Sequence, residues 1–323
     1  MSTETPPPHA YVDADARIAL IGAGTIGLSF AALHLPFLAS PSQLTVYDTR
    51  HDLAQYVAST LPKYLPAASP QTTGRGDYDL SSIRLTTSLP DAVRDADIVQ
   101  EQGPENLPFK AAIWAEVAKH AKNPNVLFWS STSGITATAQ AESGGLGDDQ
   151  AARLVVVHPF NPPHVMPLLE VVPGARTSDE TVRRTVAFWH ARGREPVVQH
   201  KEVPGFVANR LAYALLREAV HLVREGVVSA KELDRIVQAS MGPRWAVAGP
   251  FHSYHAGGGP GGLEAFFKNI GGTIQRCWDD SGKENVGEGW EDDIFRQAEE
   301  AYGVVDTSRR DRLTRGVLEA ARK

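Results

Sequence analysis

The 323-residue sequence contains a single cysteine, Cys277, and no continuous apolar run of membrane-spanning length. One cysteine permits neither an intramolecular disulfide nor a cysteine-ligated metal cluster, which fits a reducing compartment. A membrane-spanning helix would need about 18 or more apolar residues in succession. The first residues also lack the apolar core of a secretory signal and the arginine-rich pattern of a transit peptide. We therefore expect a cytosolic protein without a metal site.

An excess of positive charge is missing as well. The 32 lysines and arginines are outnumbered by 38 aspartates and glutamates, which gives a formal net charge of −6. General nucleic-acid binders are usually basic, so this balance argues against that class. The content of 42% hydrophobic and 22% charged residues is that of an average globular protein, and the length suits two domains. Residues 1–16, rich in proline and acidic residues, predict a disordered leader.

Short apolar runs alternate with helical patterns over the first two thirds of the chain. The helical patterns cover residues 28–35, 107–121 and 177–192. The strands are expected at residues 17–21, 44–47, 83–87, 97–100, 126–129, 154–157, 166–172 and 196–199. This alternation predicts an α/β fold in which a Rossmann-like, doubly wound and mostly parallel sheet occupies residues 17–203.

From residue 204 onward the pattern changes to helices and glycine-rich turns. A long helix is expected at residues 206–225, ended by Gly226. Ser229 and Glu232 then form a capping-box pattern, in which each side chain satisfies a free amide near the other. Because no clear strand follows, we expect an all-α domain over residues 204–323.

The first predicted strand leads directly into Gly22-Ala-Gly24-Thr-Ile-Gly27. In a dinucleotide-binding turn these glycines allow a tight turn, close approach of a pyrophosphate and close packing of helix on strand. Asp48, at the end of the next predicted strand, would accept hydrogen bonds from the adenosine ribose and repel the 2′-phosphate of NADP. This favours NAD as the cofactor, although Arg50 leaves use of NADP open. The alternative is an ordinary glycine turn in another α/β protein.

His158 ends a predicted strand, at the sheet edge where ligands bind in open α/β sheets. Oxidation of an alcohol needs a base for the hydroxyl proton, and histidine suits this because it titrates near neutral pH. Glu170 falls on the next predicted strand, where its carboxylate would orient the imidazole and stabilise its protonated form. A satisfied buried histidine and a structural salt-bridge partner are the alternatives.

The ordered set of motifs resembles the 3-hydroxyacyl-CoA dehydrogenase superfamily, within it the branch of L-gulonate 3-dehydrogenase (lambda-crystallin) and carnitine 3-dehydrogenase. The match runs in family order over about residues 17–270. The motifs that carry the resemblance are residues 21–27, 99–107, 130–133, 158–163, 167–173, 204–211 and 244–250. The resemblance implies NAD as cofactor and a homodimer formed by the helical domain, which also closes over the cleft.

The resemblance also implies roles for individual residues. His158 would be the catalytic base and Glu170 its orienting partner, while Ser133 and Asn209 would hydrogen-bond the reacting oxygen of the substrate. The residues implied to bind NAD are Gly22, Gly24, Thr25, Ile26, Gly27, Asp48, Glu105, Lys110 and Asn161. Other interpretations stay open: Ser133 could cap a helix, and Asn209, Glu105 and Lys110 could belong to solvated helix faces.

The substrate is the least determined part. A small 3-hydroxy acid resembling L-gulonate is the first expectation, with carnitine and a 3-hydroxyacyl-CoA as alternatives. Residues 62–82 contain only Lys63 and Arg75 as basic groups, which argues mildly against binding of CoA phosphates. Arg244 is a candidate partner for a substrate carboxylate, or a plain surface arginine. A quaternary ammonium such as that of carnitine would attract aromatic faces, and the candidates are Trp245, Phe251, Tyr254 and Trp278.

Two hypotheses from other classes remain. The first is a non-catalytic, crystallin-like protein that binds NAD and serves a structural purpose. The second is a regulatory module that senses NAD. The joint presence of His158, Glu170, Ser133 and Asn209 favours an enzyme over both.

Overall fold

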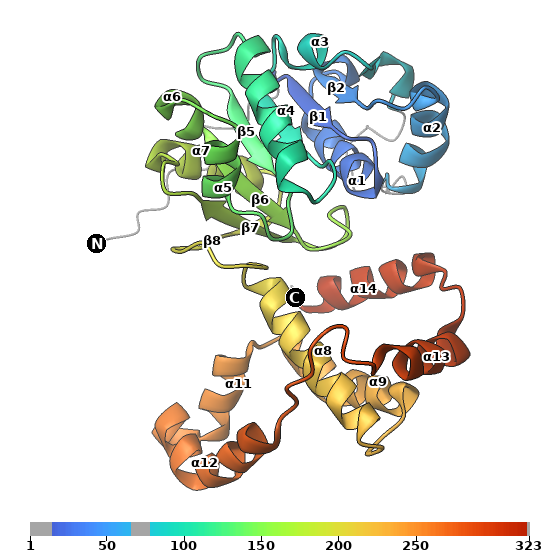
Figure 1. The fold of residues 1–323 in the computed structure, drawn as a ribbon, viewed down its shortest axis with the longest axis vertical. Coiled ribbons are helices and arrows are strands. Elements are labelled where there is room, and N and C mark those ends of the chain that lie inside the picture. The colour runs from blue at the N-terminus through green and yellow to red at the C-terminus, as the bar shows by residue number, and fades with distance from the viewer. Residues whose placement is uncertain (1–14, 66–77, 322–323) are drawn as a thin grey trace. The chain divides into compact units, whose positions relative to one another are not determined.

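The computed structural model describes residues 15–65 and 78–321 (Figure 1). The chain divides into two compact units, Met1–Arg210 and Leu211–Lys323. Nearly all of the expected leader and most of the 62–82 segment lie outside the described residues, so both expectations stay as predictions.

The first unit is built on one sheet with the strand order β3-β2-β1-β4-β5-β6-β7-β8. Neighbouring strands are parallel throughout, except that β6 and β7 are antiparallel. The strands are β1 (Ile18–Ile21), β2 (Leu44–Tyr47), β3 (Arg84–Thr86), β4 (Ile98–Glu101), β5 (Leu127–Ser130), β6 (Leu154–Pro159), β7 (Leu168–Pro173) and β8 (Glu195–Val198). The order reverses between β1 and β4, which confirms the predicted doubly wound sheet. In sheets of this kind, ligands bind outside the carboxyl ends of the strands at such a reversal.

Helices cover both faces of this sheet. They are α1 (Thr25–His34), α2 (Leu53–Thr60), α3 (Leu89–Val93), α4 (Leu107–His120), α5 (Ala137–Ser143), α6 (Asp148–Ala151) and α7 (Asp179–His190). Short 3-10 turns lie at Leu35–Phe37, Pro41–Gln43, Leu61–Lys63 and Leu80–Ser82. Alternate residues of β1 enter opposite cores, because side chains on a strand point alternately to its two faces. Leu20 joins the core formed with α1 and α7, and Ile21 joins the core formed with α3, α4 and α5.

The described part of the second unit consists of helices and turns only, as expected. It continues α8 (Ala208–Arg224), which begins in the first unit, and contains α9 (Ala230–Ala239), α10 (Met241–Trp245), α11 (Pro250–Gly257), α12 (Gly262–Asp280), α13 (Glu291–Tyr302) and α14 (Thr307–Ala321), with a 3-10 turn at Gly259–Gly261. The predicted capping box of Ser229 and Glu232 is present at the start of α9. Among the described helices of the chain, none is long and apolar enough to cross a membrane.

Candidate active site

The glycine-rich turn lies between β1 and α1, and each of its glycines has its own steric reason. Gly22 has φ +104°, a conformation that side chains rarely adopt. A Cβ on Gly27 would lie 1.9 Å from the Gly22 carbonyl oxygen, so helix and strand pack too closely for any side chain. A Cβ on Gly24 would meet open space. Gly24 is the N-cap of α1, and no described side chain caps this helix. Its first amides therefore suit an anionic pyrophosphate.

Asp48 follows β2 and contacts the glycine-rich turn directly. Its Oδ2 accepts a hydrogen bond from the Ala23 amide at 2.8 Å, and its Oδ1 accepts one from the Arg50 amide at 3.0 Å. The Arg50 guanidinium is held by Asp52 at 2.7 Å and lies 3.5 Å from the ring centroid of Tyr56. The carboxylate at this position and the open helix end fit the ribose and pyrophosphate of NAD.

His158 and Glu170 form a hydrogen-bonded pair. They are direct register partners in the antiparallel β6–β7 ladder. His158 Nδ1 lies 2.8 Å from Glu170 Oε2, and the two residues are only 4% and 3% exposed. Because a carboxylate accepts, Nδ1 is the donor, which leaves Nε2 as the imidazole nitrogen that can accept a proton. The sequence placed these residues on neighbouring strands, and the structure brings their side chains into contact.

The second oxygen of Glu170 is also fully engaged. Its Oε1 accepts hydrogen bonds from Gln199 Nε2 at 2.6 Å, from the Val207 amide at 2.9 Å and from the Ala208 amide at 3.0 Å. Burial alone would raise the pKa of Glu170, but the hydrogen bonds from His158, Ala208 and Val207 together hold it below its ordinary value. Glu170 is therefore ionised at neutral pH, as the partner of a protonated imidazole must be.

A left-handed turn directs the two backbone amides at Glu170. Gly205 has φ +73° and Phe206 has φ +53°, and a positive φ is unusual for a bulky residue such as phenylalanine. The Phe206 side chain is completely buried, and its ring centroid lies 5.3 Å from that of His158. The turn thus covers the imidazole with an aromatic ring and delivers the first amides of α8 to the carboxylate.

Ser133 and Asn209, the residues expected to bind the reacting oxygen, are neighbours. The Asn209 side-chain amide donates to the Ser133 carbonyl oxygen at 3.3 Å. Ser133 follows β5, and β5 is the parallel neighbour of β6, which carries His158. Since parallel strands end at the same edge of a sheet, Ser133 belongs to the edge where the His158–Glu170 pair lies.

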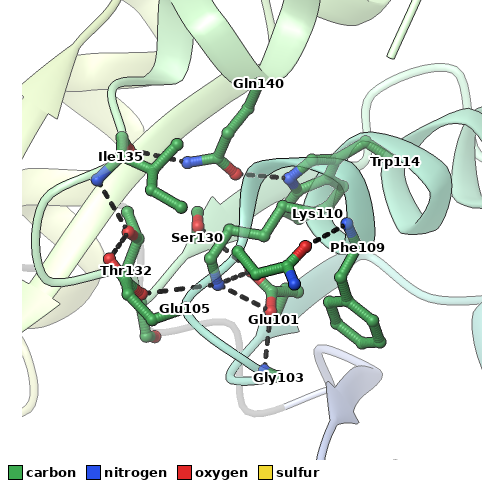
Figure 2. Close-up of polar contacts among 12 residues, drawn as sticks. Glu101, Gly103, Glu105, Phe109, Lys110, Trp114, Ser130, Thr132, Ile135 and Gln140 are labelled. Atoms are coloured by element: carbon green, nitrogen blue, oxygen red, sulfur yellow. Dashed lines mark hydrogen bonds and ion pairs between the residues drawn. The ribbon is translucent and has the colours of Figure 1, made fainter. Parts of the chain in front are cut away.

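A buried ion pair lies at the end of β4 (Figure 2). Lys110 Nζ is 3.0 and 2.9 Å from the two carboxylate oxygens of Glu101, and these residues are 1% and 0% exposed. The Ser130 hydroxyl donates to Glu101 at 3.1 Å, and the Gly103 amide donates to it at 2.6 Å. The pair therefore ties α4 to the ends of β4 and β5.

Glu105 connects this pair to the turn after β5, as Figure 2 shows in part. Its Oε1 accepts hydrogen bonds from the Thr132 hydroxyl and from the amides of Ser133 and Gly134, both at 3.0 Å. Its Oε2 lies 3.9 Å from Lys110 Nζ. In this arrangement the Lys110 ammonium is paired with the carboxylates of Glu101 and Glu105, and Glu105 fixes the turn that contains Ser133. Their contact with the nicotinamide half of NAD stays a prediction.

The other predicted site residues are placed as follows. Thr25 and Ile26 begin α1, and Asn161 is exposed just after β6. Arg244 is exposed on α10 of the second unit. No role was predicted from the sequence for Glu101, Thr132, Gln199 or Phe206. Of these, Glu101 and Gln199 had a usable signal, since each is a polar residue at the end of a strand, where site residues gather.

Comparison with known families gives two matches that together cover most of the chain. Residues 17–203 match the NAD-binding domain of 3-hydroxyacyl-CoA dehydrogenase, and residues 205–288 match the C-terminal domain of the same family.

Relatives and solved structures agree with these matches. The chain is 35% identical to a 3-hydroxyacyl-CoA dehydrogenase of Gibberella moniliformis over 283 residues, covering 86% of this chain and 80% of that protein. It is 34% identical to an L-carnitine dehydrogenase of Streptomyces griseus over 322 residues, covering 95% and 93%. The structure of 5-formyl-3-hydroxy-2-methylpyridine 4-carboxylic acid 5-dehydrogenase aligns with TM-score 0.76 and 28% identity over 95% of this chain and 98% of that one.

Proposed function

The chain belongs to the 3-hydroxyacyl-CoA dehydrogenase family and is an NAD-dependent dehydrogenase, and from this we propose that it oxidises the 3-hydroxyl group of a small 3-hydroxy acid of the carnitine type. The observation that carries the proposal is the buried contact between His158 Nδ1 and Glu170 Oε2 at 2.8 Å. It supplies an oriented base at the edge of the sheet where the cofactor is expected.

The relatives favour carnitine over L-gulonate, which was the first expectation from the sequence. L-carnitine dehydrogenases of Streptomyces coelicolor and S. griseus are 36% and 34% identical to this chain. The second unit also offers exposed aromatic side chains of the kind that attract a quaternary ammonium, namely Trp245, Phe251, Tyr254 and Trp278. Arg244 is the proposed partner of the substrate carboxylate. A 3-hydroxyacyl-CoA is the second candidate, because of the Gibberella relative.

In the proposed mechanism, His158 Nε2 accepts the proton of the substrate hydroxyl. The ionised Glu170 then stabilises the imidazolium, because a hydrogen-bonded opposite charge lowers the free energy of the protonated form. Ser133 and Asn209 hydrogen-bond the substrate oxygen and keep the hydroxyl in line with the base. Burial under Phe206 limits access of bulk water to the imidazole. Bound NAD would supply the acceptor for the hydride that leaves the carbon bearing this hydroxyl group.

NAD is held by the open end of α1 and by Asp48. Asp48→Ala should weaken NAD binding by about tenfold or more and reduce the preference over NADP, because a charged hydrogen-bond acceptor for the ribose is lost. Titration of both cofactors by fluorescence would measure this. Equal affinity of the wild-type protein for NAD and NADP would contradict the role of Asp48.

We include a homodimer in the proposal, as the resemblance implies. The helical unit leaves many large apolar side chains uncovered in the single chain, including Leu211 at 63% and Phe295 at 62% exposed. Apolar surface of this extent marks an interface. Light scattering of the full chain should give twice the chain mass of 34.9 kDa, and a monomer would contradict this part of the proposal.

The function is tested by supplying NAD with L-carnitine, L-gulonate, 3-hydroxybutyrate or 3-hydroxybutyryl-CoA and following NADH absorbance. L-carnitine should give the highest kcat/KM. A higher value for the CoA ester would favour the second candidate. Cofactor binding with no reduction by any substrate would favour the crystallin-like alternative and contradict the proposal.

A further inference from the structure

We propose that Gln199 is a positioning residue that fixes the orientation of the Glu170 carboxylate and limits its hold on the His158 proton. This inference rests on the proposed role of His158 as the base. Gln199 comes directly after β8, whose Val197 is the register partner of Glu170 on β7. Position 199 lies two residues further along, on the same face of the strand as Val197. Its own amide donates to the Val171 carbonyl oxygen at 2.9 Å, which anchors the backbone beside the carboxylate.

The side-chain amide of Gln199 has one productive orientation. With Nε2 facing Glu170, it donates to Oε1 at 2.6 Å. A flipped amide would set its own oxygen against a carboxylate oxygen, and two acceptors repel each other. In the observed orientation, Gln199 Oε1 is buried and has no hydrogen-bond partner among the described residues. Leaving the Gln199 oxygen buried and unpaired costs free energy, and the hydrogen bond from Nε2 to Glu170 offsets this cost.

Donation to Oε1 has two consequences for the His158–Glu170 pair. First, the side-chain donor adds to the two backbone amides on Oε1, so three hydrogen bonds fix the plane of the carboxylate more tightly than two would. Second, each donor on Oε1 takes part of the negative charge, so less of it stabilises the imidazolium. Two of these donors are backbone amides at the start of α8, Val207 and Ala208. Among the described side chains that contact Oε1, Gln199 is the one that a substitution can remove.

The test compares Gln199→Met with two other variants. Methionine keeps the length and the burial but cannot donate. Gln199→Glu keeps the shape and donates only while it is protonated. Thr185→Val is the matched control. It removes a buried hydrogen bond in the same unit, the one that Trp129 Nε1 donates to Thr185 Oγ1 at 3.0 Å, and neither residue hydrogen-bonds His158 or Glu170. The readouts are the pH dependence of kcat/KM for oxidation and the NMR titration midpoint of the His158 imidazole in the cofactor-free protein.

Gln199→Met should lower kcat/KM at neutral pH by about three- to thirtyfold, as expected for one hydrogen bond to a charged group. It should also move the acidic limb of the pH profile and the imidazole titration upward by about half a pH unit or more. With one hydrogen bond fewer, the Glu170 carboxylate keeps more of its negative charge and stabilises protonated His158 more strongly. Gln199→Glu should resemble wild type at low pH and lose activity as its new carboxyl ionises. Thr185→Val should lower the melting temperature without moving either midpoint.

The outcomes separate this inference from the proposed function. If Gln199→Met leaves both midpoints at their wild-type values, the positioning role is overturned even when the enzyme is active. If the imidazole titration moves while the pH profile of catalysis does not, Gln199 positions Glu170 as inferred, but His158 is not the base. If Thr185→Val moves the midpoints equally, the effect is one of general destabilisation and the inference is wrong.

Discussion

Two hydrogen-bonded pairs, each of a basic and an acidic side chain, lie buried at the carboxyl edge of the same sheet, and they differ in what they can do. Both Lys110–Glu101 and His158–Glu170 are almost fully buried, with nitrogen–oxygen distances of 2.8–3.0 Å. Lysine stays charged near neutral pH, whereas histidine changes its charge there. The first pair therefore serves as a fixed support for backbone turns, and the second can move a proton.

The sharpest test of this difference replaces His158. His158→Gln keeps a side-chain amide that can donate to Glu170, but the amide cannot act as a base. Oxidation should slow by about 10²- to 10⁴-fold, because general-base catalysis is lost. The melting temperature, in contrast, should change little. Steady-state kinetics measures the rate and calorimetry measures the melting temperature of one preparation. If His158→Gln keeps most of its activity, His158 is not the base and the proposed difference between the two pairs is wrong.

Replacing Lys110 should have the opposite signature, with a large effect on stability. Lys110→Met leaves the buried carboxylate of Glu101 without its cation, which costs about 3–5 kcal/mol of unfolding free energy. Urea unfolding would measure this. The double variant Glu101→Gln with Lys110→Met is the control, since it removes both charges and should recover part of the loss. If the single and double variants are equally stable, the buried pair is not the support inferred here.

A smaller effect on catalysis is expected at Glu105, whose half-exposed side chain connects Lys110 to the turn that contains Ser133. Glu105→Gln keeps an oxygen that accepts from the Ser133 and Gly134 amides but loses the attraction to Lys110 at 3.9 Å. An exposed charge contributes about 1 kcal/mol or less, so kcat/KM should fall only a few-fold. Glu105→Ala removes the acceptor and should cost more. Equal kinetics for the two variants would exclude a role for the turn contacts.

The smallest expected effect concerns acid stability. The pKa of Glu170 is lower in the folded protein than its ordinary value of 4.5, because its hydrogen bonds outweigh burial. The ionised carboxylate thus contributes stability above pH 4.5, and this contribution disappears as the pH falls through the folded pKa. Glu170→Gln has no such proton to bind, so its unfolding free energy should decline less steeply below pH 4.5. Parallel slopes for the two proteins in urea titrations would refute this.

The fold was largely predictable from the sequence, because strand burial and glycine geometry are local signals. The β2 strand was predicted at its observed bounds, 44–47. The helix after the glycine turn begins at Thr25 instead of residue 28, since Gly24 caps it. Helix α2 was missed because its buried face consists of Leu53 and Val57 alone, too few for a helical period to be recognised.

The site was predictable only in part. His158 and Glu170 could be named from strand ends, but their contact depends on the antiparallel register of β6 and β7, which the sequence pattern does not encode. Glu105 and Lys110 were named, whereas Glu101 was not. Its position at the end of a strand indicates a site residue, but the separation of nine positions from Lys110 matches no helical or strand spacing and so does not identify the pair. Gln199 contacts Glu170 because β7 and β8 pair in parallel, and a pairing between strands far apart in the sequence cannot be read from local sequence patterns.

Glu170 Oε1 accepts hydrogen bonds from the Gln199 side chain, from the Val207 amide just before α8 and from the Ala208 amide, which is the first of that helix. One atom thus serves both the imidazole's partner and the anchoring of a helix that runs into the next unit. Any kinetic loss measured after truncating this carboxylate would mix two free energies, one of proton transfer and one of helix docking. A rate ratio from such a variant overstates the worth of the pair. Substitutions of His158 or Gln199 leave Glu170 in place as the acceptor for the Val207 and Ala208 amides. They therefore measure the free energy of proton transfer separately from that of helix docking.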